Sequence, residues 1–359
     1  MNKKRALVNL TMENKKPRIL VIGTGGAISV QIVNGKWQPG EIPQQKLIDN
    51  IARIKENFEI KTTNLFRMDS GDMLPHHWLT LANTIYYQMK DYDGIVVTIG
   101  TDTMHYADTA IAFLIQNNNI PIVFTGSQAP STQLNTDALW NLKNAITVAG
   151  KSDIAETLVV FNNLILRATR TKRINASEFR AFYTNVEKPL GTVEQFIKID
   201  SEHKKRGKRI PKLYKKLETK VKIIKIYPGF DDTEIITAVD KGTKGIILEG
   251  YNLGNVPLLE NTLKKSIEYA NKNNVPIILT GDCNPGRYWS KIYSPNIGKR
   301  LTGLKLIPAY DMLTETAYVK LMWVLGQTQK YPEVKKMMQK NYVGEITPFN
   351  KKDNGIQVV

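Results

Sequence analysis

Short apolar runs, rich in β-branched residues, alternate along the chain with longer segments whose apolar residues recur every three or four positions. An uninterrupted apolar run predicts a strand buried on both faces, and the longer spacing predicts an amphipathic helix. In the first half of the chain, the predicted strands cover residues 18–22, 60–65, 94–99, 122–124 and 158–161. The predicted helices cover residues 43–57, 74–89 and 102–116. This alternation favours an α/β fold with a large, mainly parallel N-terminal sheet flanked by helices.

The alternating pattern stops at a dense run of lysine and arginine within residues 201–216 and starts again after it. The later strands are predicted at residues 221–226, 245–250 and 277–282, and the later helices at residues 262–273, 314–325 and 333–339. A chain of 359 residues is long enough for two domains. We therefore expect a flexible lead at 1–17, an N-terminal domain at 18–203, a basic linker at 204–220 and a smaller C-terminal α/β domain at 221–359.

The composition is that of a soluble globular protein, with 42% hydrophobic and 23% charged residues. No apolar run approaches the ~20 residues that a membrane helix needs. Cys283 is the only cysteine, which excludes an intrachain disulfide and a thiolate metal cluster. His76 and His77 are adjacent, which is not the usual spacing of zinc ligands. We expect a cytoplasmic protein without a metal or another cofactor.

The formal net charge of +17 brings in nucleic acid as a partner to be considered. Much of the excess lies in the basic run within residues 201–216, where no nucleic-acid-binding module is recognisable. A solvated linker or surface hairpin is the favoured explanation for such a run. An RNA partner therefore stays an alternative.

Two glycine-rich turns carry the candidate chemistry, because each presents a threonine directly after an apolar strand. Thr24 follows the first strand, and Thr101 with Asp102 follows the strand at 94–99. Ligands of α/β proteins bind where parallel strands end. The first turn lacks the third glycine of a dinucleotide-binding turn, since Ile28 stands there. Two hydroxyls, one beside a carboxylate, indicate covalent hydrolytic chemistry.

Several separate motifs, in order, resemble the asparaginase/glutaminase family, and most closely its cytoplasmic type I L-asparaginases. The resemblance extends over residues 18–348 and implies two α/β domains. The motifs that carry it are Thr24-Gly25-Gly26, Met68-Asp69-Ser70-Gly71-Asp72-Met73, Gly100-Thr101-Asp102-Thr103-Met104, Thr125-Gly126-Ser127-Gln128 and Arg167-Ala168-Thr169-Arg170-Thr171-Lys172-Arg173.

The resemblance implies a role for each matching residue. Thr24 would attack the side-chain amide carbon of L-asparagine and release ammonia, and water would then release L-aspartate. Thr101, with a lysine and Asp102, would form the proton relay. The substrate would be bound by Ser70, Gly71, Thr101, Asp102 and Ser127. Family members are homodimers or homotetramers, which we expect here too.

The chain departs from the family pattern at two functional positions. Without gaps, the reactive lysine falls on Arg173, with Lys172 as its neighbour. Arginine is always protonated and is a poor base. Arg173 is therefore a candidate for the relay by its position in the motif, and Lys172 by its chemistry. In the loop over the site, where the family has a tyrosine, this chain offers Trp37. Arg173 therefore leaves open an amino-acid-binding protein without catalysis. The positive charge keeps a second alternative to an asparaginase, an amidase acting on aminoacyl-tRNA.

Overall fold

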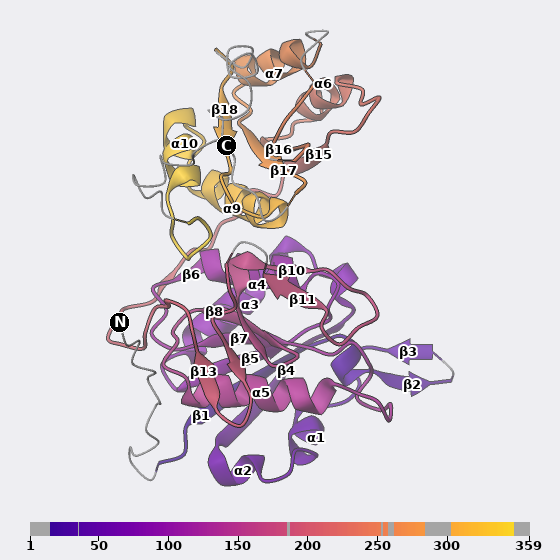
Figure 1. Ribbon diagram of the computed structural model, residues 1–359, viewed down its shortest axis with the longest axis vertical. Coiled ribbons are helices and arrows are strands. Elements are labelled where there is room, and N and C mark those ends of the chain that lie inside the picture. The colour runs from indigo at the N-terminus through magenta and orange to yellow at the C-terminus, as the bar shows by residue number, and fades with distance from the viewer. Residues whose placement is uncertain are drawn as a thin grey trace, which may run out of the picture. The chain divides into compact units, whose positions relative to one another are not determined.

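The computed structural model describes residues 15–34, 36–184, 187–252, 254–257, 262–283 and 303–347. Two compact units make up the chain (Figure 1). The first consists of Met1–Ile111, Asn117–Thr184 and Lys188–Leu213, and the second of Ala112–Gln116, Asn185–Glu187 and Tyr214–Val359. Most of the predicted lead at 1–17 lies outside the described residues.

An eight-stranded sheet forms the centre of the first unit. Its first five strands run parallel, in the order β4 (Glu59–Met68), β1 (Arg18–Gly25), β5 (Gly94–Thr98), β7 (Ile122–Thr125) and β8 (Thr157–Phe161). Three antiparallel strands complete the sheet: β9 (Leu164–Arg167), β12 (Gly191–Val193) and β13 (Ile197–Ile199). The predicted mainly parallel sheet and α/β class are confirmed. The antiparallel edge was not predicted.

Both faces of the parallel strands β1, β5, β7 and β8 are buried, as their uninterrupted apolar sequences require, whereas the edge strand β4 is partly exposed. On β1, Ile19 and Val21 belong to the core beneath α5 (Ala138–Lys151). Leu20 and Ile22 point to the opposite face, because side chains alternate along a strand, and they are buried as well. The other helices of this unit are α1 (Gln44–Asp49), α2 (Ile54–Asn57), α3 (Pro75–Gln88) and α4 (Met104–Leu114), which continues into the second unit.

The single helix predicted at 43–57 is wrong. The chain forms the two short helices α1 and α2, because it turns between them and Arg53 adopts a left-handed conformation with φ of 60°. No helix was predicted at α5, whose buried face includes Asn141 and Asn144 among its apolar residues. The remaining short elements are β2 (Gln31–Val33), β3 (Lys36–Gln38), β10 (Thr171–Arg173), β11 (Phe182–Thr184), β14 (Lys212–Leu213), η1 (Ala27–Ser29), η2 (Ser70–Asp72) and η3 (Ala168–Arg170).

Helix α4 buries a carboxyl group, that of Asp108. Burial raises the pKa of Asp108 well above its ordinary value, and neither carboxyl oxygen has a hydrogen-bond partner within the described residues. The folded protein therefore holds a proton that the unfolded chain releases, and rising pH favours unfolding until Asp108 ionises in the folded state as well.

We expect Asp108→Asn to remove this pH dependence. The free energy of unfolding of Asp108→Asn, minus that of the wild type, should increase with pH. The increase should be about 1.4 kcal/mol for each pH unit between the ordinary carboxyl pKa and the raised one. Urea unfolding at a series of pH values measures it. Asp91, an exposed carboxyl of the same unit, gives the matched control Asp91→Asn. A gain that is equal at every pH would contradict the prediction.

The first part of the basic run is anchored to the first unit. Arg206 donates from Nε to Ser152 O over 2.7 Å and from its other nitrogens to Asp93 O and Ala149 O. His203 Nε2 lies 2.9 Å from Asp153 Oδ1. Burial lowers the pKa of Arg206, against the effect of the nearby carboxylates of Asp93 and Asp153. The first unit accordingly extends to Leu213, past the start of the predicted linker at 204.

Arg206→Ala should destabilise the protein by about 2–4 kcal/mol, because three backbone carbonyls lose a charged donor. Chemical denaturation measures the loss. Lys208→Ala, at an exposed cation of the same run, is the matched control and should change stability by less than about 0.5 kcal/mol. Equal effects of the two substitutions would show that the run is a solvated linker after all.

The second unit contains a parallel sheet whose strands follow in chain order. They are β15 (Val221–Lys225), β16 (Gly245–Gly250), β17 (Ile277–Gly281) and β18 (Leu306–Pro308). Apolar residues of α6 (Thr233–Asp240) and α7 (Thr262–Lys272) share one core with this sheet, and α9 (Thr314–Gln327) contacts β15, β16 and β17. Helix α10 (Tyr331–Gln339) packs on α9, and β6 (Ile115–Gln116) also belongs to this unit. The predicted second, smaller α/β domain is confirmed.

A buried ion pair organises the end of this unit. Lys320 Nζ lies 2.7 Å from Glu345 Oε1, and both side chains are fully buried. The same ammonium donates to the carbonyls of Met338 and Lys340 over 2.8 and 2.7 Å. The Glu345 carboxylate in turn accepts the N–H of Tyr342 and Val343. This network fastens the residues after α10 to α9.

Candidate active site

Thr24 lies at the carboxyl end of β1, beside the carboxyl end of β5. Its hydroxyl donates to Thr98 O over 2.9 Å, and its side chain is buried. The parallel register pairs Gly23 with Thr98, so the ends of β1 and β5 lie level with each other. The Thr24 hydroxyl is therefore held where two neighbouring parallel strands end, as the sequence indicates.

Two glycines after Thr24 let the turn pack closely against its neighbours. Gly25 and Gly26 have φ of 114° and 77°, the left-handed region that favours glycine. A Cβ on Gly25 would lie 2.1 Å from Met68 O, and one on Gly26 would lie 2.3 Å from Gly100 N. Only glycine fits at either position. The contact between Gly26 and Gly100 brings the Thr24 turn against the turn that carries Thr101.

Ser70 joins the Thr101 turn to the end of β4. The Ser70 hydroxyl accepts the N–H of Asp102 over 3.2 Å, and Ser70 O accepts the Thr103 hydroxyl over 2.6 Å. Thr101 is buried, whereas the Asp102 side chain is 60% exposed. The structure thus brings together the predicted residues Thr24, Ser70, Thr101 and Asp102.

Arg173 reaches this cluster from β10. Its Nη1 donates to Asp102 Oδ1 in an ion pair, and its Nη2 donates to Gln128 Oε1 over 3.2 Å. The Nε of Arg173 is buried and has no hydrogen-bond partner within the described part of the chain. A guanidinium, with fixed charge, therefore lies beside the Asp102 carboxylate.

Lys172 does not take this place, because successive side chains of a strand point to opposite faces. In the β10–β11 hairpin Lys172 is paired with Tyr183, and Arg173 with Phe182. Since the Arg173 side chain turns toward Asp102, Lys172 faces the other side of the hairpin. Of the two residues that the sequence left open, Arg173 is the one next to Asp102.

Gln128 holds the Arg173 guanidinium in position and is itself fixed at both ends. Its backbone N–H donates to the Asp137 carboxylate at 3.0 and 3.1 Å. Its side-chain nitrogen donates to Glu178 O at 3.1 Å. The amide oxygen is thereby turned toward Arg173. Gln128 belongs to a motif that the sequence indicates, but its contact with Arg173 could not be inferred from it.

The remaining predicted site residues are Ser127, Gly71 and Trp37. Ser127 is buried two residues after the end of β7, and its hydroxyl has no partner among the described residues. The Gly71 N–H already donates to Asp69 Oδ1 over 2.9 Å, and Gly71 is exposed. Trp37 lies on β3 in the short β2–β3 hairpin. The sequence did not indicate the contact between Thr98 and the Thr24 hydroxyl. Thr98 accepts this hydrogen bond with its backbone carbonyl, a group that every residue has.

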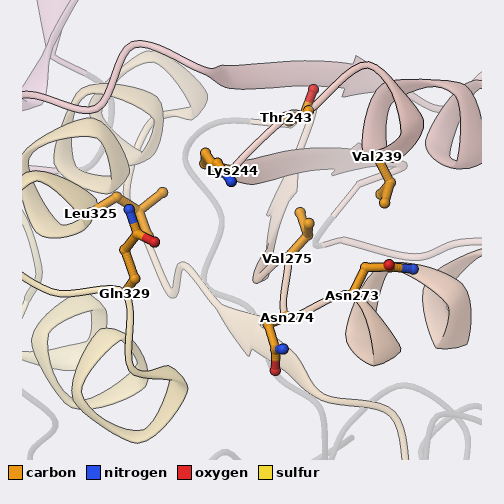
Figure 2. Close-up of a pocket in the computed structure, with 9 residues that line it drawn as sticks. Val239, Thr243, Lys244, Asn273, Asn274, Val275, Leu325 and Gln329 are labelled. Atoms are coloured by element: carbon orange, nitrogen blue, oxygen red, sulfur yellow. The ribbon is translucent and has the colours of Figure 1, made fainter.

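Outside this cluster, a cavity of about 250 Å³ lies in the second unit (Figure 2). Its polar lining consists of Thr243, Lys244, Asn273, Asn274 and Gln329, and includes none of the predicted site residues. Over the described ranges, no three histidine, cysteine or acidic residues gather as metal ligands would. Within the same ranges, none of the helices has the length and apolar content that crossing a membrane requires.

Comparison with known proteins matches both units to family models. The model "Asparaginase, N-terminal" matches residues 18–205, and the model "Glutaminase/Asparaginase C-terminal domain" matches residues 220–338. A glutamyl-tRNA(Gln) amidotransferase subunit of Pyrococcus abyssi is 36% identical over 352 residues, covering 94% of this chain and 78% of that protein. The L-asparaginase of Thermococcus kodakarensis is 32% identical over 331 residues, covering 92% of this chain and 99% of that protein.

Solved structures agree with the family models. The thermostable L-asparaginase from Thermococcus kodakarensis superimposes with a TM-score of 0.86 at 30% identity, covering 92% of this chain and all (100%) of that one. The "probable cytoplasmic L-asparaginase" from Campylobacter jejuni gives a TM-score of 0.75 at 25% identity, with 91% and 100% covered. With both of its units matched by family models and its fold shared with these enzymes, the chain belongs to the asparaginase family.

Proposed function

We propose that the chain hydrolyses the side-chain amide of L-asparagine to L-aspartate and ammonia, with Thr24 as the nucleophile. The observation that carries this proposal is the packing of Gly26 against Gly100. It sets the Thr24 turn beside the Thr101–Asp102 turn at the ends of two neighbouring strands. The L-asparaginase of Thermococcus kodakarensis, similar over nearly its whole length, supports the same reaction.

In the proposed first step, Thr24 Oγ1 bonds to the amide carbon and the carbon–nitrogen bond breaks. The leaving nitrogen departs as ammonia after taking up the hydroxyl proton, and an ester on Thr24 remains. Water then attacks the ester carbon, the bond to Oγ1 breaks, and Thr24 recovers its proton as the acid leaves. The attack requires the Thr24 hydroxyl to turn from Thr98 O toward the substrate.

The substrate's charged groups have suitable partners beside Thr24. Ser70 accepts a hydrogen bond from Asp102 N, so its own hydroxyl proton is available to the α-carboxylate. The exposed Asp102 carboxylate can accept the α-ammonium. Gly26 N already donates to Met68 O over 3.1 Å, which favours the Gly100–Thr101 turn over Gly26 as the source of N–H donors for the oxyanion.

Arg173 favours a second function, amino-acid binding without hydrolysis. A guanidinium stays protonated at any physiological pH, so it cannot take a proton from Thr101 or from water. A lysine there would need only a lowered pKa to serve as a base. Under the first proposal, the charge of Arg173 orients Asp102, and hydrolysis proceeds slowly because this base is lacking.

A third function, amide hydrolysis linked to aminoacyl-tRNA, is favoured by the relatives. Glutamyl-tRNA(Gln) amidotransferase subunits match this chain at 36% identity in Pyrococcus abyssi and at 37% in Pyrococcus furiosus. The net charge of +17 suits a nucleic-acid partner. In all three cases we propose a homodimer or homotetramer, as the resemblance implies. The Campylobacter jejuni protein supports a cytoplasmic location.

Ammonia release from the purified full chain tests the three functions. L-asparagine and L-glutamine are offered separately, with and without glutamyl-tRNA(Gln), and the acid product is quantified alongside the ammonia. Equal amounts of aspartate and ammonia from asparagine alone support the asparaginase proposal. Glutamine hydrolysis that needs the tRNA supports the third function. Binding of asparagine by calorimetry without release of ammonia at any pH supports the second function and refutes the first.

A further inference from the structure

We infer that Arg173 makes this site bind the acid product more tightly than the amide substrate, so that L-aspartate inhibits its own formation. The inference rests on the proposed function, because it concerns the same site and ligand pair. The Arg173 guanidinium has three nitrogens that donate hydrogen bonds. Two nitrogens are used on Asp102 and Gln128, and Nε is buried with no partner in the described residues.

A second unused donor lies nearby along the chain. The Ser127 hydroxyl is buried without a partner in the same described ranges, and the next residue, Gln128, contacts the guanidinium. Buried donors without acceptors are costly, and a ligand that supplies acceptor oxygens recovers that cost. A carboxylate supplies two acceptor oxygens, whereas a carboxamide offers one oxygen and an NH₂ group that is itself a donor.

Charge also favours binding of L-aspartate over L-asparagine. Asp102 and Arg173 neutralise each other, so Asp102 is already partly engaged and holds a substrate ammonium less strongly. The reaction turns a neutral carboxamide into an anion, which then lies in a site with a permanent cation. Hydrogen bonds between a guanidinium and a carboxylate are among the stronger ones in proteins. A lysine could lose its proton and release the anion, but an arginine cannot.

Calorimetric titration tests the inference in the Thr24→Ala background, where turnover is blocked. We expect L-aspartate to bind about tenfold or more tightly than L-asparagine. In Thr24→Ala/Arg173→Gln, the affinity for aspartate should fall about tenfold, while that for asparagine changes less than about threefold. Equal affinities of the two ligands, or equal losses in the double variant, would refute the inference.

Two further measurements separate the possible failures. Should the glutamine variant not fold, Arg173→Lys replaces it, and its aspartate affinity should fall as rising pH removes the lysine proton. An affinity that is constant with pH in that variant counts against the inference. Wild-type protein that releases ammonia but shows no preference for aspartate refutes the inference alone. Protein that neither binds asparagine or aspartate nor releases ammonia refutes the proposed function as well.

Discussion

Thr24→Ala should lower ammonia release from L-asparagine by on the order of 10³-fold or more, because it removes the hydroxyl that forms the proposed ester. The substitution also leaves Thr98 O without its donor, so a stability loss of about 1 kcal/mol accompanies it. Asparagine binding should survive, since the substrate's charged groups contact other residues. The rate is measured by coupled ammonia detection, and binding by calorimetry.

The matched control is Thr84→Ala. The Thr84 hydroxyl also donates to a backbone carbonyl, that of Thr80, over 3.0 Å, but it lies on α3 away from the cluster. This variant should keep the wild-type rate. Thr24→Ser, which keeps a hydroxyl, should retain measurable turnover. If Thr24→Ala hydrolyses asparagine at the wild-type rate, Thr24 is not the nucleophile.

Arg173→Lys should raise the rate of hydrolysis by about 10²-fold, because it introduces a group that can give up and take back a proton beside Thr101 and Asp102. The shorter ammonium can still reach the Asp102 carboxylate. Its rate should increase with pH as the lysine loses its proton, whereas the wild-type rate should show no such step. Initial rates between pH 6 and about 10 reveal both effects.

Arg180→Lys is the control for Arg173→Lys. Arg180 lies in the same hairpin region, with its guanidinium over the ring of Tyr183 at 5.7 Å, and it is exposed. Its substitution should leave rate and pH profile unchanged. A rate for Arg173→Lys at or below that of the wild type would mean that a lysine at position 173 does not act as the relay base, and would favour another base.

Much of the fold could be predicted, because fully buried parallel strands need continuous apolar sequence and their helices need one apolar face. The strands around Ile22 and Val97 were predicted on this ground. Helix α5 was not predicted, since Asn141 and Asn144 lie in its buried face. Their amides bind Gly126 O and Asn163 Oδ1, partners distant in the sequence. Such long-range hydrogen bonds make a polar residue suitable for a core, and they leave no local pattern.

For the candidate site as well, part of the arrangement follows from the sequence and part only from the tertiary structure. The sequence by itself determined which side chains lie at the candidate site, because glycine-rich turns at strand ends present Thr24, Thr101 and Asp102 whatever surrounds them. Only the tertiary structure decided that Arg173, and not Lys172, lies beside Asp102. That choice depends on which face of β10 turns toward the end of β5, and a strand's two faces are equivalent until neighbouring chain segments pack against one of them.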